Sequence, residues 1–169
     1  NDVTHHQSVS NISPYLLEGS NLTISGRVLP ICDVPRMVYG NKPVDGGNLL
    51  LTPVEKEELL AHEPKAKKWL NRLIGAEEFI NGKERWCLWL TDITPEELEE
   101  MPLVAARVEA VKQMRLASTD KGANKLAETP HLFRESYNPK TFIVVPCHSS
   151  ERREYLPLGL MDDTFITTN

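Results

Sequence analysis

The chain has 169 residues, of which 40% are hydrophobic and 25% are charged, and its formal net charge is −5. This length suffices for one well-buried domain, with or without a tail, and leaves little room for two independent domains. The negative charge excludes a protein that coats nucleic acid without selection, because neutralising phosphates supplies nearly all of the affinity of such proteins.

The sequence shows no signal segment and no membrane span. Its apolar runs stay far below the roughly 18 residues that cross a bilayer. The chain begins Asn-Asp-Val-Thr, without an initiator methionine, so we expect an excised piece of a soluble cytoplasmic protein. Cys32, Cys87 and Cys147 are odd in number and widely separated, which argues against a metal site and favours buried, reduced thiols.

Basic residues concentrate late in the chain. Residues 103–153 contain nine Lys and Arg against five Asp and Glu, whereas residues 1–102 contain ten against sixteen. The last sixteen residues contain three acidic side chains and no Lys or Arg. An acidic body with one basic face could meet DNA at a defined place, although ordinary surfaces also segregate charge.

The start of the chain divides into an arm and the beginning of a domain. Residues 1–20 mix Ser, Asn, His and Pro without periodicity, which predicts an irregular arm or a linker from a preceding domain. Residues 21–169 are predicted to form a single domain. Within it, residues 22–28 alternate apolar and polar side chains, as a half-buried strand does. A loop rich in Pro and Gly follows, as far as Gly46-Gly47.

Helices are predicted in the middle of the chain. Thr52-Pro53-Val54-Glu55 is a capping box with proline at the first helical position, which predicts a short helix to about Ala61. Pro64 is predicted to start a second helix that Gly75 ends. Its apolar face would consist of Trp69, Leu70, Leu73 and Ile74.

A hairpin and a further pair of helices are predicted next. Residues 79–90 read as two strands around Asn81-Gly82, because the left-handed backbone of a tight hairpin suits Asn and Gly. The capping box Thr94-Pro95-Glu96-Glu97 predicts another short helix, and Pro102 a longer one through Leu116.

Strands are predicted again near the C-terminus. A polar break at residues 118–122 precedes a short helical stretch, and the β-branched run at residues 141–146 predicts a strand. A final strand is predicted at residues 155–160. Helices in the middle with strands on both sides favour an α+β domain.

Catalytic machinery is nearly absent from the sequence. Gly46-Gly47 lies among Pro43, Asp45 and Asn48 and is interpreted as a turn, since a lone Gly-Gly is no nucleotide fingerprint. The chain also lacks the Asn-Pro-Pro-aromatic or Asp-Pro-Pro-aromatic tetrad with which amino-methylating enzymes hold a flipped base. We therefore predict no catalytic, cofactor-binding or metal-binding residues.

Two sets of residues suggest an active site, and the local sequence argues against both. Asp45, Glu63 and Lys65 could form a nuclease site, but Pro64 indicates a helix start rather than the strand that such a site uses. Ser149-Ser150 beside His148 suggests a nucleophile, but adjacent residues on an extended chain point to opposite faces.

The polar segment at residues 146–157 is the strongest candidate for function. On an extended chain Glu151, Arg153 and Tyr155 share one face. In a major groove Arg can hold both acceptors of guanine while Glu accepts from the amino group of cytosine, so the pair could read one G·C pair. The alternative is a strand whose solvent-facing charges pair with one another, and the residue pattern alone does not decide between the two.

Four blocks of the sequence, in order, resemble a known family. They are residues 43–51, residues 75–90, residues 107–118 with Arg-Val-Glu-Ala-Val and Arg-Leu-Ala-Ser, and Ser149-Ser150-Glu151-Arg152-Arg153. Together they are similar to the target-recognition domain of the MmeI family, from about Ile12 to the C-terminus. That family comprises single-chain restriction-and-modification enzymes and related stand-alone DNA methyltransferases of bacteria.

The resemblance implies a fold, a function and partners. It implies a mixed, largely antiparallel curved sheet with several short helices packed on it. The fragment itself is then no enzyme and holds no cofactor, but reads double-stranded DNA for a parent that transfers methyl from S-adenosylmethionine to adenine N6, with or without a linked endonuclease. Its second partner is the methyltransferase domain of the same chain.

The resemblance also implies site residues. The acid and base that set specificity match Glu151 and Arg153, a further determinant falls at Tyr155, and its partner falls near Thr119. Charge and position suggest phosphate contacts at four residues: Arg115, Lys121, Lys125 and Arg152.

Two other classes of function, a protein-interaction module and an RNA-binding domain, fit the residues less well. A protein-interaction module would expose Trp86, Trp89 and Tyr137 to a partner, but Trp86 and Trp89 lie on a strand that reads as buried on both sides. An RNA-binding sheet would interleave aromatic and basic residues, and only 7% of this chain is aromatic.

Overall fold

The computed structural model describes residues 6–168 of a chain that forms two compact units, Asn1–Met37 and Val38–Asn169. Among the described residues of the first unit, an isolated antiparallel bridge joins Ile12 to Glu18. The predicted strand at residues 22–28 is wrong: these residues pair with no strand, and Leu22, Ile24 and Val28 are 70%, 77% and 100% exposed. The division follows Met37, and the predicted domain start at residue 21 stays a prediction.

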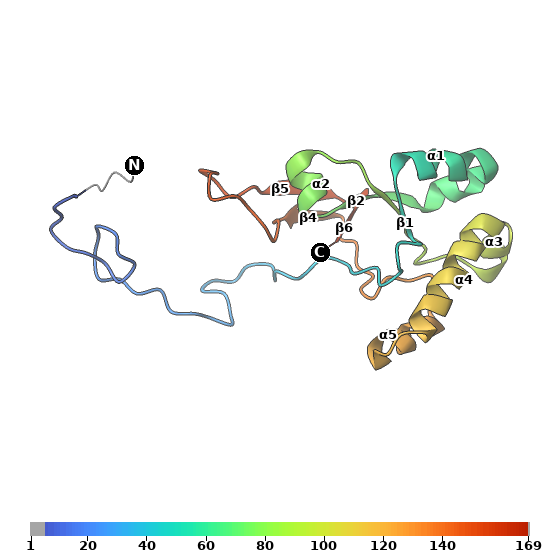
Figure 1. Cartoon of the computed structure of the whole chain (residues 1–169), viewed down its shortest axis with the longest axis horizontal. Helices are drawn as coiled ribbons and strands as arrows, with labels where there is room; N and C mark the ends of the chain where they lie inside the picture. The colour runs from blue at the N-terminus through green and yellow to red at the C-terminus, as the bar shows by residue number, and fades with distance from the viewer. Residues whose placement is uncertain (1–5, 169) are drawn as a thin grey trace. The chain divides into compact units, whose positions relative to one another are not determined.

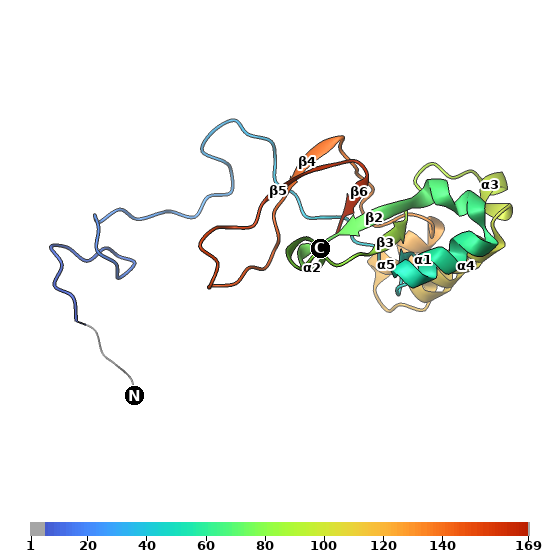
Figure 2. The ribbon, with the colours of Figure 1, turned by 90° about the horizontal axis from the view of Figure 1, so that it is seen from above.

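The second unit contains two β-sheets (Figures 1 and 2). The larger sheet has the order β1-β3-β2-β6, antiparallel except for the parallel pair β2 and β6. The smaller sheet is the antiparallel pair β4 and β5. The strands are β1 (Leu50–Leu51), β2 (Leu70–Ile74), β3 (Trp86–Leu88), β4 (Thr141–Val144), β5 (Gly159–Asp162) and β6 (Phe165–Thr167). The predicted α+β class with a largely antiparallel sheet is confirmed.

Short helices connect and cover the strands. They are α1 (Pro53–His62), α2 (Ala76–Asn81), α3 (Pro95–Glu99), α4 (Pro102–Leu116) and α5 (Lys121–Lys125), with 3₁₀ turns at η1 (Pro64–Trp69) and η2 (Leu126–Glu128). Both predicted capping boxes are confirmed. The Thr52 and Thr94 hydroxyls accept from the backbone N–H three residues on, and each N3 glutamate accepts from the cap's N–H in return.

The predicted second helix is only half correct. The 3₁₀ turn η1 begins at Pro64 as expected, but Leu70–Ile74 is the strand β2 rather than the end of a helix. β2 has neighbours on both sides, β3 and β6, so inter-strand hydrogen bonds replace helical ones. A five-residue segment with apolar side chains at Leu70, Leu73 and Ile74 is compatible with either state, and here the tertiary partners decide.

The predicted hairpin around Asn81-Gly82 is wrong. Asn81 ends helix α2, and Gly82 caps it in the left-handed conformation with φ 65°. Gly is favoured at a helix end for the same reason that it is favoured in a hairpin turn, namely its tolerance of positive φ. The strand after it, β3, is shorter than predicted, and its partners are β1 and β2.

One hydrophobic core supports the second unit. It gathers residues from β1, α1, β2, β3, α4, β6 and the segment after η2, where Trp89 meets Phe133 edge-to-face at 5.3 Å between ring centroids. The fully buried members include Leu49, Leu88, Val104, Val111 and Ile166. Among the described residues, no helix is both long and apolar enough to cross a bilayer.

The small β4–β5 sheet packs on helix α2 through a close approach at Gly159. A Cβ atom at this position would lie 2.4 Å from Phe79 Cε2 and 2.7 Å from Cζ. The ring of Phe79 therefore occupies the space above the Gly159 backbone, and no larger residue fits without displacement. This contact holds the β4–β5 sheet, and the loop that it carries, against the rest of the unit.

Gly159→Ala is expected to lower the free energy of unfolding by about 1–3 kcal/mol, because the new methyl group overlaps the ring of Phe79. Urea denaturation of the chain measures the change. Phe79→Leu in the same chain should recover part of the loss, and an additive double variant would show that the two residues do not compete for space.

Candidate nucleic-acid interface

The first candidate surface is the loop at residues 145–158, which joins β4 to β5. It carries Glu151, Arg152, Arg153 and Tyr155, and all four side chains are exposed. Its tip is a turn: Arg153 N–H donates to the Ser150 carbonyl at 3.0 Å, and Arg152 N–H donates to Ser150 Oγ at 3.2 Å.

The turn corrects the predicted arrangement of this segment. Glu151, Arg153 and Tyr155 were expected on one face of an extended chain, but the backbone bends at residues 150–153 and the strand begins at Gly159 rather than at residue 155. The residues still lie together, because they share one loop between two paired strands. Solvent-exposed side chains at the end of a hairpin can enter a groove without moving the fold.

The second candidate surface is the corner between α4 and α5. The Asp120 carboxylate caps α5 by accepting from Gly122 N–H at 2.8 Å. Asn124 Nδ2 donates to the carbonyls of Arg115 at 2.7 Å and Ser118 at 2.9 Å, which closes the end of α4. These contacts hold the corner in shape and leave three candidate side chains exposed: Thr119, Lys121 and Lys125.

The structure does not bring the two candidate surfaces together. Both ribbon views place the loop at residues 145–158 beside β4 and β5, at one end of the second unit, and α5 beside α4, at the other end (Figures 1 and 2). Thr119 therefore does not neighbour Tyr155 within this chain. If both read DNA, they contact separate parts of the duplex.

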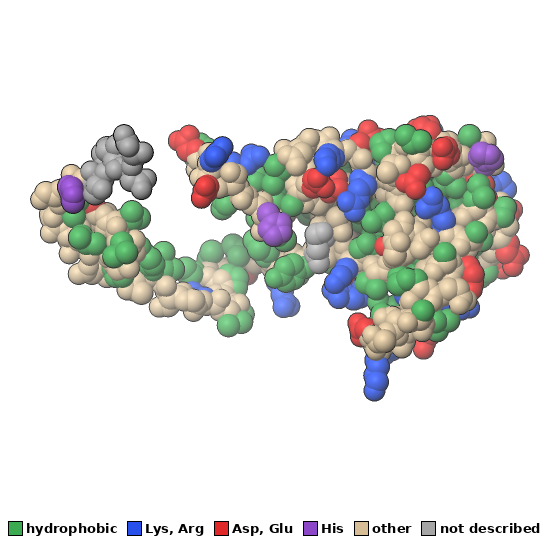
Figure 3. All heavy atoms as spheres, in the orientation of Figure 1, with side chains coloured by type: hydrophobic (Ala, Val, Ile, Leu, Met, Phe, Trp, Pro, Cys, Tyr) green, Lys and Arg blue, Asp and Glu red, His purple; other side chains and the backbone are tan. Residues whose placement is uncertain are grey.

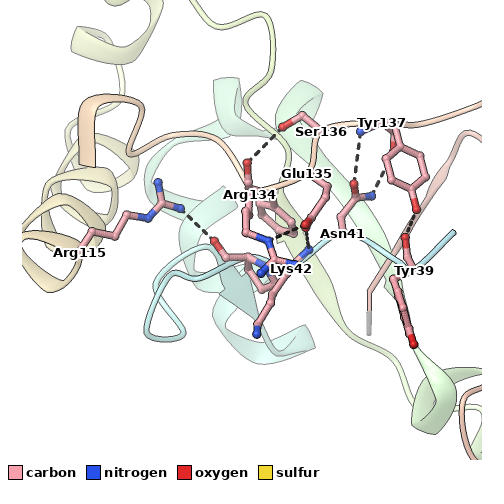
Figure 4. Close-up of polar contacts among 10 residues, drawn as sticks. Tyr39, Asn41, Lys42, Arg115, Arg134, Glu135, Ser136 and Tyr137 are labelled. Carbon is pink, nitrogen blue, oxygen red and sulfur yellow. Dashed lines mark hydrogen bonds and ion pairs between the residues drawn. The ribbon is translucent and has the colours of Figure 1, made fainter. Parts of the chain in front are cut away.

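Arg115 has a different place from the one predicted. It was a phosphate-contact candidate, but its exposed fraction is 0%. Its guanidinium donates to five backbone carbonyls at 2.7–3.0 Å, those of Pro43, Val44, Leu126, Thr129 and Leu132. Figure 4 shows the side chain reaching from its helix toward the loop that contains Lys42. A buried guanidinium whose donors are taken up by backbone carbonyls cannot reach a phosphate, so this prediction is wrong.

Burial and a neighbouring carboxylate act on the charge of Arg115 in opposite directions. Burial lowers the pKa of the Arg115 guanidinium, and the negative charge of Asp45 raises it in return. Asp45 is itself buried and accepts from Leu49 N–H at 2.6 Å. The five carbonyl acceptors and this carboxylate together replace the hydration that a buried cation has lost.

A second polar cluster fixes the loop before β1 to the segment after η2. Asn41 is fully buried; its side chain donates to the Tyr137 carbonyl at 3.1 Å and accepts from Tyr137 N–H at 3.3 Å. Arg134 N–H donates to the Lys42 carbonyl at 2.9 Å, and Glu135 accepts from Lys42 N–H at 2.9 Å. Figure 4 shows these residues side by side.

The residues that could have formed a nuclease site have structural partners instead. Glu63 is buried and accepts from Leu103 N–H at 2.5 Å and Val104 N–H at 3.2 Å, so it caps the N-terminus of α4. Lys65 pairs with Glu100 at 2.6 Å. Within residues 6–168, no group of three His, Cys, Asp or Glu could hold a metal ion.

The other predicted side chains are placed as follows. Cys87 is buried, and burial raises the pKa of its thiol; Cys32 and Cys147 are exposed, so the prediction of buried thiols is confirmed for Cys87 and wrong for the other two. Trp86 and Trp89 are half-buried against the core rather than free to anchor a partner. On the face shown in Figure 3, basic and acidic side chains are interspersed over residues 38–168 rather than gathered by sign.

Comparison with known proteins decides the family. The model of the MmeI target recognition domain matches residues 18–169 of this chain. The chain belongs to this family. It is 44% identical over 162 residues to DNA methyltransferase A of Bacillus subtilis (strain 168), covering 95% of this chain and 18% of that protein. It superposes with a TM-score of 0.82 and 40% identity on type IIL restriction-modification enzyme MmeI, solved in complex with DNA, covering 95% of this chain and 22% of that one.

The target recognition domain thus spans about a fifth of the length of these two relatives. Sequence reasoning missed the two polar clusters that hold it together, those of Arg115 and Asn41. A signal for Arg115 was available: it lies at the core spacing of Val104, Val108 and Val111 on α4. A charged residue at an apolar helical position indicates a buried cation with dedicated acceptors.

Arg115→Met is expected to destabilise the domain by about 3–5 kcal/mol, because the substitution leaves five part-buried carbonyls and the buried Asp45 carboxylate without their cationic partner. Urea denaturation measures the change. Lys112→Met, an exposed position of the same helix, serves as the matched control and should shift stability by less than about 0.5 kcal/mol. Equal effects of the two substitutions would contradict the role given to Arg115.

His131 makes stability depend on pH. Burial and then the charge of Arg115 lower its pKa from the ordinary 6.5, so the folded state binds a proton less readily than the unfolded state. The stability from neutral His131 is fully present above pH 6.5 and is lost as pH falls through the lowered folded pKa. His131→Gln should therefore lose less free energy of unfolding than the native chain between about pH 7.5 and about pH 5.5. Parallel losses in the two proteins would contradict this.

Proposed function

We propose that this chain is the sequence-specific DNA recognition domain of a longer, S-adenosylmethionine-dependent adenine-N6 DNA methyltransferase. Its task is to place the methyl-transferring part of the protein at a short site in double-stranded DNA. The supporting observation is membership of the target recognition family, together with a TM-score of 0.82 to an enzyme solved in complex with DNA. The similarity to a protein named DNA methyltransferase A supports the methyl-transferring parent.

The loop at residues 145–158 is the proposed base-reading element. Its tip presents Glu151 and Arg153 to solvent from a turn, and no ion pair within 4.0 Å joins either of them to another described residue. Arg can donate to both acceptors of guanine, and Glu can accept from the cytosine amino group, so the two can read the partners of one G·C pair. Tyr155 is proposed to touch a position next to that base pair, and Thr119 a separate part of the duplex.

Phosphate contacts are proposed at Lys121, Lys125 and Arg152, and no longer at Arg115. These three side chains are exposed, and none forms an ion pair with a described acidic residue. The charge of a domain with a net −5 does not by itself favour DNA, so local cations must supply the attraction. Phosphate contacts fix register and orientation, while the loop supplies the sequence information.

The methyl donor does not fit the residues of this chain. A nucleotide-type cofactor needs a glycine turn that leads from a strand into a helix. Here Gly46 and Gly47, with φ 61° and 85°, form a turn that leads into strand β1, and α1 starts instead at Thr52-Pro53. We therefore assign S-adenosylmethionine and the transfer step to the larger part of the polypeptide, outside these residues.

Replacing Glu151 and Arg153 together by Gln in the full-length protein should change one position of the methylated site and leave the others intact. Each bidentate contact discriminates against the wrong base by about 1–3 kcal/mol, enough to relax the choice at that position. Modification-sensitive sequencing of DNA from cells that express each variant maps the sites.

Glu109→Gln with Lys112→Gln, an exposed acid and base on α4, provides the matched control and should leave the methylated site unchanged. Methylation at the native site, with full activity, by the loop variant would refute the assignment of the pair. Loss of all methylation together with loss of duplex binding would place the pair in general DNA contact rather than in base reading.

A further inference from the structure

The β4–β5 sheet has one covered face and one uncovered face. Side chains alternate along a strand, so Phe142, Val144 and Met161 point inward with Gly159, on which Phe79 of α2 packs. The opposite face should be polar in a sheet that stands in water on that side. It is not polar.

Beyond the Thr141–Asp162 pair, the uncovered face is apolar. Ile143 and Leu160 are paired across the sheet and are 66% and 73% exposed. The alternation continues this face to Val145 and Leu158 just beyond the strand ends, and both are exposed large hydrophobic side chains. An exposed apolar patch on ordered strands, rather than single scattered residues, indicates an interaction surface.

The chemistry of the face argues against nucleic acid as its occupant. Ile143, Val145, Leu158 and Leu160 offer neither charge nor hydrogen-bond donors, whereas phosphates require both. The polar residues of the neighbouring loop, Glu151 to Arg153, lie beyond it at the turn. The face therefore suits the apolar surface of a protein.

The size of the face distinguishes a linked domain from a separate molecule. Four aliphatic side chains offer on the order of a few hundred Å², well below the roughly 800 Å² per partner that stable association of separate proteins buries. A linked domain needs less area, because the connection raises its effective concentration to about the millimolar range. The chain spans 18% and 22% of the two relatives, so most of each such polypeptide lies outside the matched region.

We propose that the face formed by Ile143, Val145, Leu158 and Leu160 docks against an apolar surface of another domain of the same polypeptide, outside residues 1–169. This inference rests on the proposed function, in which the chain is one domain of a longer methyltransferase. The docked face would hold the β4–β5 loop in a fixed position relative to the methyl-transferring domain. Base reading and methyl transfer would then be kept in register.

Hydrogen–deuterium exchange in the absence of DNA tests the docking directly. Amides of residues 141–145 and 158–162 should exchange about tenfold or more slowly in the full-length protein than in residues 1–169 alone, because two or more aliphatic side chains become buried. Ile143→Thr with Leu160→Thr, which keeps charge, should return the full-length rates to those of the isolated chain. Val54→Thr, also 66% exposed but on α1, is the matched control and should leave them slow.

Each other outcome overturns the proposal. Equal exchange in the two wild-type proteins would show that no domain outside residues 1–169 covers the face, and slow exchange that survives the Thr substitutions would show that other residues provide the protection. Protection of the isolated chain that grows with its concentration would identify a second copy as the occupant. Because no DNA is present, these results are independent of whether the protein reads DNA, which the methylated-site map decides.

Discussion

The buried guanidinium of Arg115 is the interaction on which the arrangement of the domain depends. It donates to carbonyls of the loop at residues 43–44, of η2 and of the segment that follows η2. No common helix or sheet joins these three stretches. Carbonyls of irregular backbone that are shielded from water need donors, and here one side chain provides five hydrogen bonds to such part-buried carbonyls. The cost of burying the cation is offset by that number of acceptors and by Asp45.

Two consequences follow for the proposed DNA surface. The corner that carries Thr119, Lys121 and Lys125 is fixed through Arg115 and Asn124, so its side chains are presented on a rigid support. The reading loop is supported separately, through the contact of Gly159 with Phe79. A scaffold that holds exposed loops by buried contacts allows the loop residues to vary without loss of the fold. Under the proposed function, substitutions at positions such as Glu151 and Arg153 would change the recognition sequence while the core stays the same.

The sequence predicted what is decided locally. Thr52 and Thr94 begin helices because their side chains bond within their own first turns, and Pro102 to Leu116 is helical by its own periodicity. It failed where distant partners decide: Leu70–Ile74 is a strand because β3 and β6 lie on its two sides. The hairpin prediction at Gly82 failed because a glycine with positive φ occurs at helix ends as well as in hairpin turns.

The candidate site shows the same division. The residue pattern singled out the segment with Glu151 and Arg153 without deciding its role, which came from the family resemblance, and the structure places both side chains in solvent. The residue pattern could not show the turn at Ser150, which depends on one backbone hydrogen bond, or the burial of Arg115, whose acceptors lie up to 72 residues away in the sequence. Charge indicates that a side chain needs polar partners. It does not indicate whether phosphates or carbonyls are those partners.

The most direct measurement is the hydrogen-exchange footprint of DNA on the full-length protein. A duplex that contains the methylated site should slow exchange in the loop at residues 145–158, and a duplex of the same length and composition with a scrambled site should slow it much less. Exchange in that loop that is unchanged by DNA, or slowed equally by both duplexes, would contradict the central claim that this loop reads the DNA sequence.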